Sequence, residues 1–240
     1  MNLVILASGM GRRLNKKLPK CLVSIDDKTL LERILNISIE FDKVIIVGGY
    51  KVNLLKKIIK NQNRKNIHLI NNKDYKTTNM VESFFKAYNK VNQDVIISYS
   101  DIIFDSSLFK KMINYNKNHL LLKSNWKKVW MLRMSEKKIK LDAEDIKVKE
   151  KTILNIGSKI NRKLPKYQFM GLIRFNKKDM KKIKNFYLSL KNKKIDFTSF
   201  LNSLIQSKVI KMNFQETNKF WFEIDTIKDL NALKGTNYKI

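Results

Sequence analysis

The fold of this chain is decided by residues 3–14, Leu3-Val4-Ile5-Leu6-Ala7-Ser8-Gly9-Met10-Gly11-Arg12-Arg13-Leu14, where an apolar run passes directly into a glycine-rich loop. The apolar residues predict a strand that is buried on both faces. Glycines after such a strand let backbone N–H groups approach phosphate oxygens without a Cβ in the way. A dinucleotide motif would need glycine where Leu14 stands, and the Gly-Lys-Ser/Thr of a P-loop is absent. The sequence therefore predicts another kind of phosphate-binding loop, with Arg13 and Lys20 as its cations.

Strand and helix patterns alternate through the rest of the first half. Further buried strands are predicted at 44–47, 67–70 and 95–99. Amphipathic helices are predicted at 29–40, 52–59 and 80–91, the first with a Thr29-x-x-Glu32 capping box and the last with Asn79 as its cap. Apolar strands separated by helices imply a parallel sheet covered on both faces. The predicted fold class is α/β: a Rossmann-like open, mostly parallel sheet with helices on both faces and an inserted antiparallel β substrate subdomain.

The insertion is predicted at about 123–175. Short alternating stretches in this region are broken by Glu150-Lys151 and Gly157, which is typical of antiparallel hairpins. Helices are then expected at 179–190 and 199–205, and extended segments at 208–214 and 220–225. No Gly/Ser- or Pro-rich linker divides the chain, so we expect residues 1–240 to form one domain.

The formal net charge of +29 allows two interpretations. A basic nucleic-acid-binding module would gather Arg and Lys on one face. Only seven of the 50 cations are Arg, however, and 43 Lys are spread over the whole length, which favours the compositional drift of a lysine-rich proteome. We therefore expect no nucleic-acid partner, although the module remains the alternative from another class. A positive field would also attract nucleoside triphosphates.

Cysteine and hydropathy patterns bear on the compartment. A single cysteine, Cys21, cannot form an internal disulfide or a cysteine metal cluster, and we expect it to be inert. No apolar stretch reaches the roughly 20 residues of a membrane span, and no basic n-region of a signal peptide precedes the first strand. We expect a cytoplasmic monomer or homodimer with no membrane partner. His68 and His119 lie in apolar stretches and are expected to be structural.

Several segments together resemble a known superfamily. They are the first loop with Pro19-Lys20-Cys21-Leu22, Thr77-Thr78-Asn79-Met80-Val81, Ser98-Tyr99-Ser100-Asp101, Trp126-x-x-x-Trp130-x-x-Arg133, Asp142-Ala143-Glu144, Gln168-Phe169-Met170-Gly171 and Phe222-Glu223-Ile224-Asp225. The chain is similar over nearly its whole length to the nucleoside-diphosphate-sugar pyrophosphorylase superfamily of nucleotidyltransferases, in the bacterial cytidylyltransferase branch of the choline-phosphate and phosphoglutamine cytidylyltransferase type.

The resemblance implies a CTP-dependent, Mg²⁺-dependent cytidylyltransferase. Such an enzyme joins CMP to a small phosphorylated or phosphonylated headgroup and releases pyrophosphate, in the decoration of surface polysaccharides or lipids. The headgroups of this type are phosphocholine, phosphoethanolamine, aminoethylphosphonate and phosphoglutamine. A sugar-1-phosphate nucleotidyltransferase is the alternative within the enzyme class.

Carboxylates at predicted strand ends are the candidate metal ligands. Asp101 follows a strand, and Glu223 and Asp225 are two residues apart in an extended segment, so both point to one face. Carboxylates with phosphate oxygens and waters suit Mg²⁺. The resemblance implies that Asp101 and Asp225 hold the metal, with Glu223 as a third ligand. The alternative is that Asp101 or Asp105, and Asp225 with Thr226, only cap the helices that follow.

The remaining site residues are expected to bind the nucleotide and the acceptor. The nucleotide-binding set is Leu6, Ala7, Ser8, Gly9, Gly11, Gly48, Asn79, Ser83 and Asp101. The catalytic cations are Arg13, which is expected to bind the leaving pyrophosphate, and Lys20, which is expected to lie between the α-phosphate and the acceptor. The acceptor-binding set is Trp126, Trp130, Arg133, Asp142, Glu144, Gln168 and Arg174. Aromatic faces beside carboxylates suit a cationic headgroup, although tryptophans at helical spacing can equally be core residues. Arg133 or Arg174 could instead bind an acceptor phosphate or carboxylate.

Overall fold

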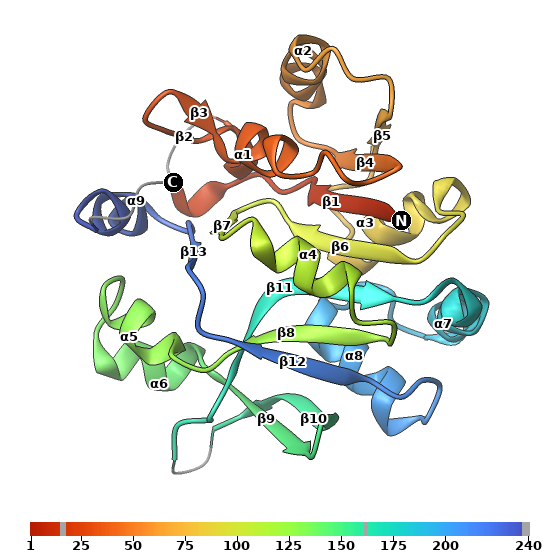
Figure 1. Ribbon diagram of the computed structural model, residues 1–240, viewed down its shortest axis with the longest axis vertical. Coiled ribbons are helices and arrows are strands. Elements are labelled where there is room, and N and C mark those ends of the chain that lie inside the picture. Colours follow the sequence, from red (N-terminus) through yellow and green to blue (C-terminus); the bar gives the residue numbers. More distant parts are fainter. Residues whose placement is uncertain (15–17, 161–162, 237–240) are drawn as a thin grey trace.

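The computed structural model describes residues 1–14, 18–160 and 163–236, and its centre is a nine-stranded sheet (Figure 1). Its strands, in spatial order, are β5 (Ile67–Asn71), β4 (Lys43–Gly48), β1 (Asn2–Ala7), β6 (Val95–Tyr99), β11 (Gln168–Phe175), β8 (His119–Lys123), β12 (Asn213–Thr217), β10 (Thr152–Lys159) and β9 (Glu144–Lys149). The pairs β5–β4, β4–β1, β1–β6 and β8–β12 are parallel. Antiparallel pairing places β11 between β6 and β8, and adds β10 and β9 at one edge. The predicted fold class, a mostly parallel sheet with added antiparallel strands, is confirmed.

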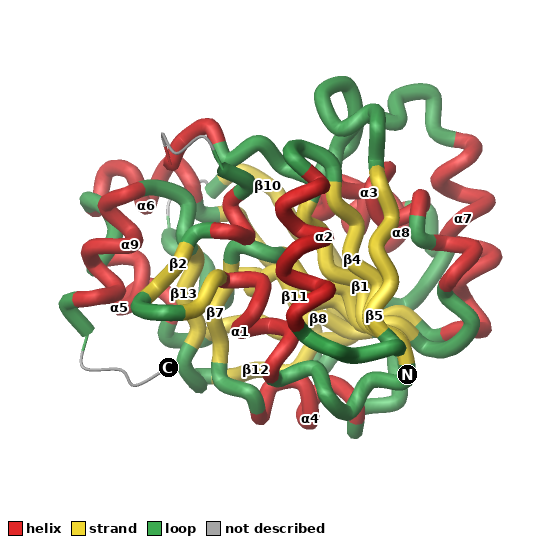
Figure 2. The backbone as a smooth tube through the Cα atoms, turned by 90° about the horizontal axis from the view of Figure 1, so that it is seen from above, coloured by secondary structure: helices red, strands yellow, loops and turns green. Residues whose placement is uncertain are grey.

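Helices cover both faces of the sheet because successive strand residues point to opposite sides (Figure 2). In β1, Leu3 and Ile5 join one core cluster, whereas Val4 and Leu6 join another. The first cluster includes side chains of α1 (Leu30–Asn36), α2 (Val52–Asn61), α4 (Ser107–Ile113), α5 (Trp126–Met131) and α6 (Glu136–Asp142). The second includes side chains of α3 (Met80–Lys86), α7 (Lys177–Ser189) and α8 (Phe197–Gln206).

A third, smaller cluster lies beside the sheet and includes residues of α9 (Ile227–Lys234). It covers two short antiparallel pairs, β13 (Trp221–Glu223) with β7 (Ile102–Phe104), and β2 (Ser24–Ile25) with β3 (Lys28–Thr29). The register of β13 on β7 places Glu223 opposite Ile102, and the backbone N–H of Ile224 donates to the carbonyl of Asp101 at 2.8 Å. This pairing brings two chain segments about 120 positions apart to the same end of the sheet.

Predicted and observed elements agree best where the apolar pattern is long. The capping box of Thr29 and Glu32 is present at the start of α1. The helix predicted at 80–91 ends at Lys86 and continues as a 3-10 turn, Tyr88–Lys90; the other 3-10 turns are Arg12–Leu14 and Lys20–Leu22. The strand predicted at 208–214 begins only at Asn213.

The region 123–175 contains more than the predicted hairpins. Besides β9, β10 and β11 it holds the helices α5 and α6, which the prediction missed because, at six and seven residues, each is too short to establish a helical period. Residues 161–162 of this region lie outside the described part of the chain. In that described part, no helix combines the length and the apolar character that crossing a membrane requires.

Candidate active site

The first loop borders a cavity of about 230 Å³ at the carboxyl end of β1 and β6. Eight of the nine predicted nucleotide-binding residues line it: Leu6, Ala7, Ser8, Gly9, Gly11, Asn79, Ser83 and Asp101. Gly11 has a φ of +64°, and a Cβ there would lie 3.1 Å from the carbonyl oxygen of Leu18 and the backbone nitrogen of Lys20. The loop therefore requires glycine at this position both for its backbone conformation and for the close approach of residues 18–20.

Gly48 is the exception in the predicted set. Its carbonyl accepts a hydrogen bond from the backbone of Asn72 at 2.8 Å, and a Cβ would meet side chains of α2 at 3.0 Å. The glycine that approaches the first loop is instead Gly49, where a Cβ would lie 3.0 Å from the carbonyl oxygen of Ser8 and 2.6 Å from the Cβ of Tyr75. The close backbone approach predicted for the Gly48-Gly49 pair is therefore made by the second glycine, and Gly48 does not line this cavity.

The opposite wall of the cavity is the start of α3. The Oδ1 atom of Asn79 accepts a hydrogen bond from the backbone of Met80 at 2.8 Å, so the residue both caps the helix and lines the cavity. Asn72, buried after β5, donates to the hydroxyl oxygens of Thr78 and Ser83, at 3.0 Å each. Sequence reasoning missed Asn72 and Thr78, although an asparagine soon after a predicted strand was the available signal.

The candidate metal ligands meet beside this cavity. One carboxylate oxygen each from Asp101, Glu223 and Asp225 lies within 4.8 Å of the other two. The Nζ atom of Lys20 donates to Asp101 at 2.8 Å and also to Asp225, and Arg13 donates to Asp225 at 3.0 Å. Both predicted catalytic cations and all three predicted carboxylates are thus in one place, where the pairing of β13 with β7 assembles them.

The electrostatics of the cluster favour a cation. Burial raises the pKa of the Glu223 carboxyl to about 7, with further increases from Asp225 and Asp101. Burial alone would lower the pKa of Lys20, but the charges of Asp101 and Asp225 outweigh it, so that the pKa rises above its ordinary value. Carboxylate oxygens are the donors that Mg²⁺ prefers, and an ammonium group already lies between two of them. The residues present therefore fit a divalent cation.

Of the four residues named in the helix-capping alternative, Thr226 and Asp105 bond to backbone N–H groups at helix starts, whereas Asp101 and Asp225 do not. The hydroxyl of Thr226 caps α9 by accepting from the backbone of Asp229, and Asp105 accepts from the backbone of Ser107 at the start of α4. The side chains of Asp101 and Asp225 bond to Lys20 instead.

Two parts of the predicted acceptor set are not supported by the structure. Trp126 and Trp130 are only 2% and 8% exposed, pack edge to face, and belong to the core, as the alternative interpretation held. Arg174 lies at the opposite end of the sheet, where it donates to the carbonyls of Met112 and Ile113 and pairs with Asp94. The prediction for Arg174 is wrong because β11 runs antiparallel to β6, so that its last residues lie far from the carboxyl end of β6.

The other predicted acceptor residues lie at two sides of the carboxylate cluster. Glu144 begins β9, and its pKa is raised by burial and by the neighbouring charge of Asp196. Gln168 donates to the Glu144 carbonyl at 2.7 Å. Asp142 instead lines a separate cavity of about 740 Å³ together with Arg133 and Asp225.

Tyr99 connects the Glu144 side to the carboxylate cluster. Burial raises its pKa well above the ordinary value, with further increases from Asp101, Glu144, Asp196 and Glu223. The ring also packs edge to face on Phe169, at 5.8 Å between centroids. Sequence reasoning did not select Tyr99 or Asp196 for this site, because a tyrosine ending a strand and an aspartate capping α8 both have ordinary structural roles.

A glycine loop, two cations and a carboxylate cluster at the carboxyl edge of an open α/β sheet are suited to the binding of a nucleotide and the transfer of its phosphoryl group. Residues 3–127 match the model of the MobA-like NTP transferase domain, and the chain belongs to this family. The expectation of an enzyme of this class is thereby confirmed.

Comparisons over the whole chain agree with this family. The chain is 31% identical to the CTP:phosphoglutamine cytidylyltransferase of Campylobacter jejuni over 255 aligned positions, which cover 97% of this chain and 98% of that protein. Among solved structures, it is similar to the inositol-1-phosphate CTP transferase of T. maritima, with a TM-score of 0.77 and 19% identity over 97% of this chain and 94% of that one. It is also similar to the CTP:phosphocholine cytidylyltransferase of Streptococcus pneumoniae, with a TM-score of 0.72 and 18% identity over 97% of both chains. At these identities the two structures support the fold alone.

Proposed function

We propose that this protein is a Mg²⁺-dependent cytidylyltransferase that transfers CMP from CTP to a small phosphorylated or phosphonylated headgroup, with release of pyrophosphate. The observation that carries the proposal is the meeting of the Asp101, Glu223 and Asp225 carboxylates with Lys20 beside the cavity of the first loop. The nearly full-length similarity to a CTP:phosphoglutamine cytidylyltransferase supports CTP as the donor and a phosphoglutamine-type acceptor. It also supports a role in surface polysaccharide or lipid decoration.

The proposed reaction is an in-line displacement. A phosphate or phosphonate oxygen of the acceptor attacks the α-phosphorus of CTP, a new P–O bond forms, and the bond to the β-phosphate oxygen breaks as pyrophosphate leaves. A phosphate monoester has a second pKa of about 6 and is largely ionised at neutral pH, so that no side chain has to remove a proton. The task of the protein is to bring two anions together and to neutralise their charge.

Each part of the site has a role in this task. The backbone amides of Gly9 and Gly11 and the Arg13 guanidinium bind the phosphates that leave, and Lys20 neutralises charge between the α-phosphate and the acceptor. Asn79 and Ser83, in the far wall of the same cavity, contact the nucleobase. Mg²⁺ held by Asp101 and Asp225, with Glu223 as a third ligand, would offset the negative charge of the phosphates when bound.

The acceptor is proposed to enter from the side of Glu144, within the insertion at about 123–175. Glu144 and Asp196 carry negative charge close to each other, and the rings of Tyr99 and Phe169 lie beside them. Carboxylates next to aromatic rings suit an ammonium group. This arrangement favours acceptors such as phosphoglutamine, phosphocholine, phosphoethanolamine and aminoethylphosphonate over hexose 1-phosphates.

The test is an acceptor panel. The protein is incubated with CTP, Mg²⁺ and each of these four compounds or a hexose 1-phosphate, and pyrophosphate release is measured for the parent and for Asp225→Ala. We expect turnover with an ammonium-bearing acceptor, and loss of turnover in the variant. The proposal is rejected if the parent releases no more pyrophosphate than Asp225→Ala with every acceptor in the panel and every nucleoside triphosphate tried.

The same panel separates the alternative functions. Turnover with only a hexose 1-phosphate would select a sugar-1-phosphate nucleotidyltransferase. A nucleic-acid-binding module would bind polynucleotides with a steep dependence on salt and would show no saturable binding of CTP. We further propose that the enzyme acts in the cytoplasm, as a monomer or homodimer of one domain, with no nucleic-acid or membrane partner.

A further inference from the structure

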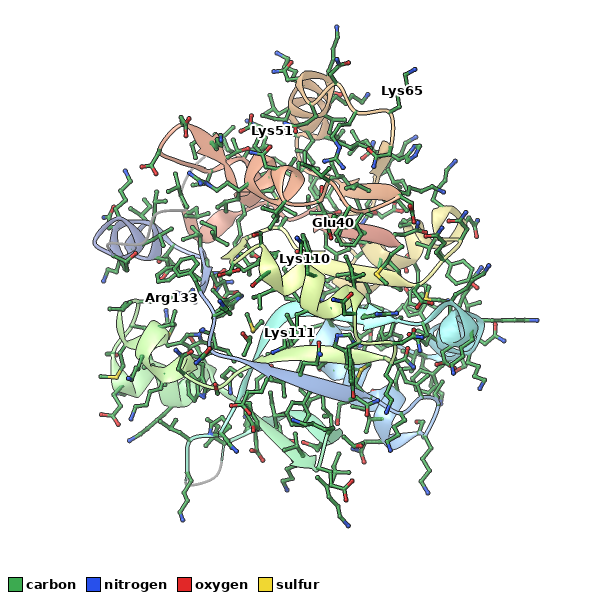
Figure 3. The ribbon with its side chains drawn as sticks, in the orientation of Figure 1. Glu40, Lys51, Lys65, Lys110, Lys111 and Arg133 are labelled. Carbon is green, nitrogen blue, oxygen red and sulfur yellow. The ribbon has the colours of Figure 1, made fainter. Side chains whose placement is uncertain are left out.

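Arg133 is a predicted acceptor residue that the structure places against the carboxylate cluster instead. It follows α5 in the insertion, and its side chain is only 1% exposed. Figure 3 shows the residue beside β13, between α9 and α5. Its Nη1 atom donates to Glu223 at 3.0 Å, while Nε and Nη2 donate to the two carboxylate oxygens of Asp229 at 3.0 and 3.3 Å. The planar guanidinium therefore binds two acidic side chains at once, one of them bidentately.

Asp229 extends this contact to the backbone of Asp225. Its Oδ2 atom accepts hydrogen bonds from the backbone N–H groups of Asp225 and Thr226, at 2.9 and 2.7 Å. Asp229 is 3% exposed, and the pairing with Arg133 and these N–H donors outweighs burial and lowers its pKa. The position of the Asp225 backbone thus depends on a carboxylate that Arg133 holds in place. Arg133 also has a direct ion pair with Asp225, at 3.7 Å between Nη2 and Oδ2.

The charges around Arg133 and Asp229 indicate what this pair of residues does. Asp101, Glu223 and Asp225 repel one another when ionised, and Lys20 pairs with Asp101 and Asp225 but not with Glu223. Arg133 supplies the missing positive charge on the Glu223 side. A lysine could supply the charge, but it lacks the planar set of N–H donors with which a guanidinium orients two carboxylates.

We infer that Arg133 is a positioning residue for the metal ligands: it directs Glu223, and through Asp229 it directs Asp225, toward a divalent cation without touching the cation or the nucleotide. The inference rests on the proposed function, because it concerns the metal site of that reaction. It assigns to the insertion a task in metal binding as well as in acceptor binding.

The test measures metal binding in the full-length protein rather than turnover. The dissociation constant of Mn²⁺ is determined by electron paramagnetic resonance in the presence of CTP and without acceptor, and the unfolding temperature is recorded for each variant. Arg133→Lys keeps the positive charge and loses the planar set of N–H donors. Asp229→Asn keeps the size of the side chain and loses the carboxylate charge.

The matched control is Arg174→Lys. Arg174 is also a buried arginine, 3% exposed and paired with an aspartate, but it lies at the other end of the sheet. We expect Arg133→Lys and Asp229→Asn to weaken Mn²⁺ binding by roughly 10- to 100-fold, the usual effect of losing a residue that orients metal ligands. Arg174→Lys should lower the unfolding temperature in a comparable way while Mn²⁺ affinity stays within about twofold of the parent.

The outcomes separate the inference from the function on which it rests. If the parent binds Mn²⁺ but both Arg133→Lys and Asp229→Asn bind it with unchanged affinity, the inference is overturned and the proposed function stands. If Arg133→Lys does not fold, unchanged affinity in Asp229→Asn alone overturns the inference. A parent protein that binds no Mn²⁺ in the presence of CTP would overturn both.

Discussion

Removal of the Lys20 charge should destabilise the protein when divalent cations are withheld, and Mg²⁺ should restore much of the loss. The ammonium group bonds to Asp101 and Asp225, and Glu223 completes the group of carboxylates. Lys20→Met keeps an unbranched side chain only one atom shorter and leaves three neighbouring carboxylates without that cation. The protein would then need a proton or a metal ion in the place of the ammonium.

The size of the effect follows from burial. Loss of one partner of a fully buried ion pair costs about 3–5 kcal/mol. The side chains of Lys20, Asp101 and Asp225 are 17%, 18% and 15% exposed, and partial screening by solvent reduces the expected cost to about 2–3 kcal/mol. In a chain of this length that corresponds to a decrease of about 4–12 °C in unfolding temperature. Mg²⁺ at about 100 times its dissociation constant would return about 2.7 kcal/mol.

The loss should also depend on pH. The pKa of Glu223 is already raised to about 7, and removal of the cation raises carboxyl pKa values further. A carboxyl group whose pKa is raised in the folded state costs stability as the pH rises through that pKa, because the unfolded chain, with its lower carboxyl pKa, releases the proton more readily. The deficit of Lys20→Met should therefore be larger at about pH 8.5 than at about pH 6.

The assay is thermal unfolding by circular dichroism in EDTA and in millimolar Mg²⁺. The control is Lys86→Met, which removes a more exposed lysine that pairs with Asp74 and Glu82. This variant should unfold near the parental temperature both in EDTA and in Mg²⁺. The reasoning is refuted if Lys20→Met unfolds at the parental temperature in EDTA. It is equally refuted if Mg²⁺ raises the unfolding temperatures of the parent and both variants by the same amount.

Three further predictions concern residues other than the charged groups of the site. Gly171→Ala should destabilise the protein by about 1–3 kcal/mol in urea unfolding, because Gly171 has a φ of +76° and a Cβ would lie 2.8 Å from the ring of Tyr99. The control, Gly235→Ala, should change stability by less than about 1 kcal/mol, because φ there is −75° and a Cβ would meet nothing closer than 3.5 Å. Equal losses of stability in the two variants would contradict the prediction. Burial lowers the pKa of His119 to about 4, so between about pH 6.5 and pH 4 the unfolded chain binds a proton that the folded protein does not bind. Stability should therefore fall by about 3 kcal/mol as the pH decreases through this window. His119→Phe should remove this part of the pH dependence when the urea midpoint is measured. Burial raises the pKa of Cys21 to about 12, so its thiol should react with a disulfide reagent at neutral pH only after the protein unfolds, and rapid labelling of the native protein would show that the site opens.

Local patterns in the sequence were enough to predict the first half of the fold. The apolar run of β1 and the helix that begins at the Thr29 cap form where expected, because the hydrophobic period and the cap are properties of consecutive residues. The first loop was predictable for the same reason, since Gly11 requires a left-handed backbone conformation that few other residues adopt. The short helices α5 and α6 were not, because one or two turns are too short to distinguish a helical period from other patterns.

Side-chain roles in the insertion depended on packing that no local pattern contains. Trp126 and Trp130 could be core residues or an acceptor surface, and burial in the first core cluster decides for the core. Arg174 and Gln168 lie on the same strand, but the antiparallel direction of β11 places only Gln168 at the carboxyl edge of β6.

The sequence by itself determined the residue types of the site: a glycine loop with two cations, and three carboxylates at strand ends. Only the tertiary structure decided that these groups meet, because the pairing of β13 with β7 joins residues that are distant along the chain. It also decided that Arg133 pairs with Glu223 and Asp229. The physical reason is that like charges can gather only where burial and opposite charges offset their repulsion, and that balance is set by the folded chain as a whole.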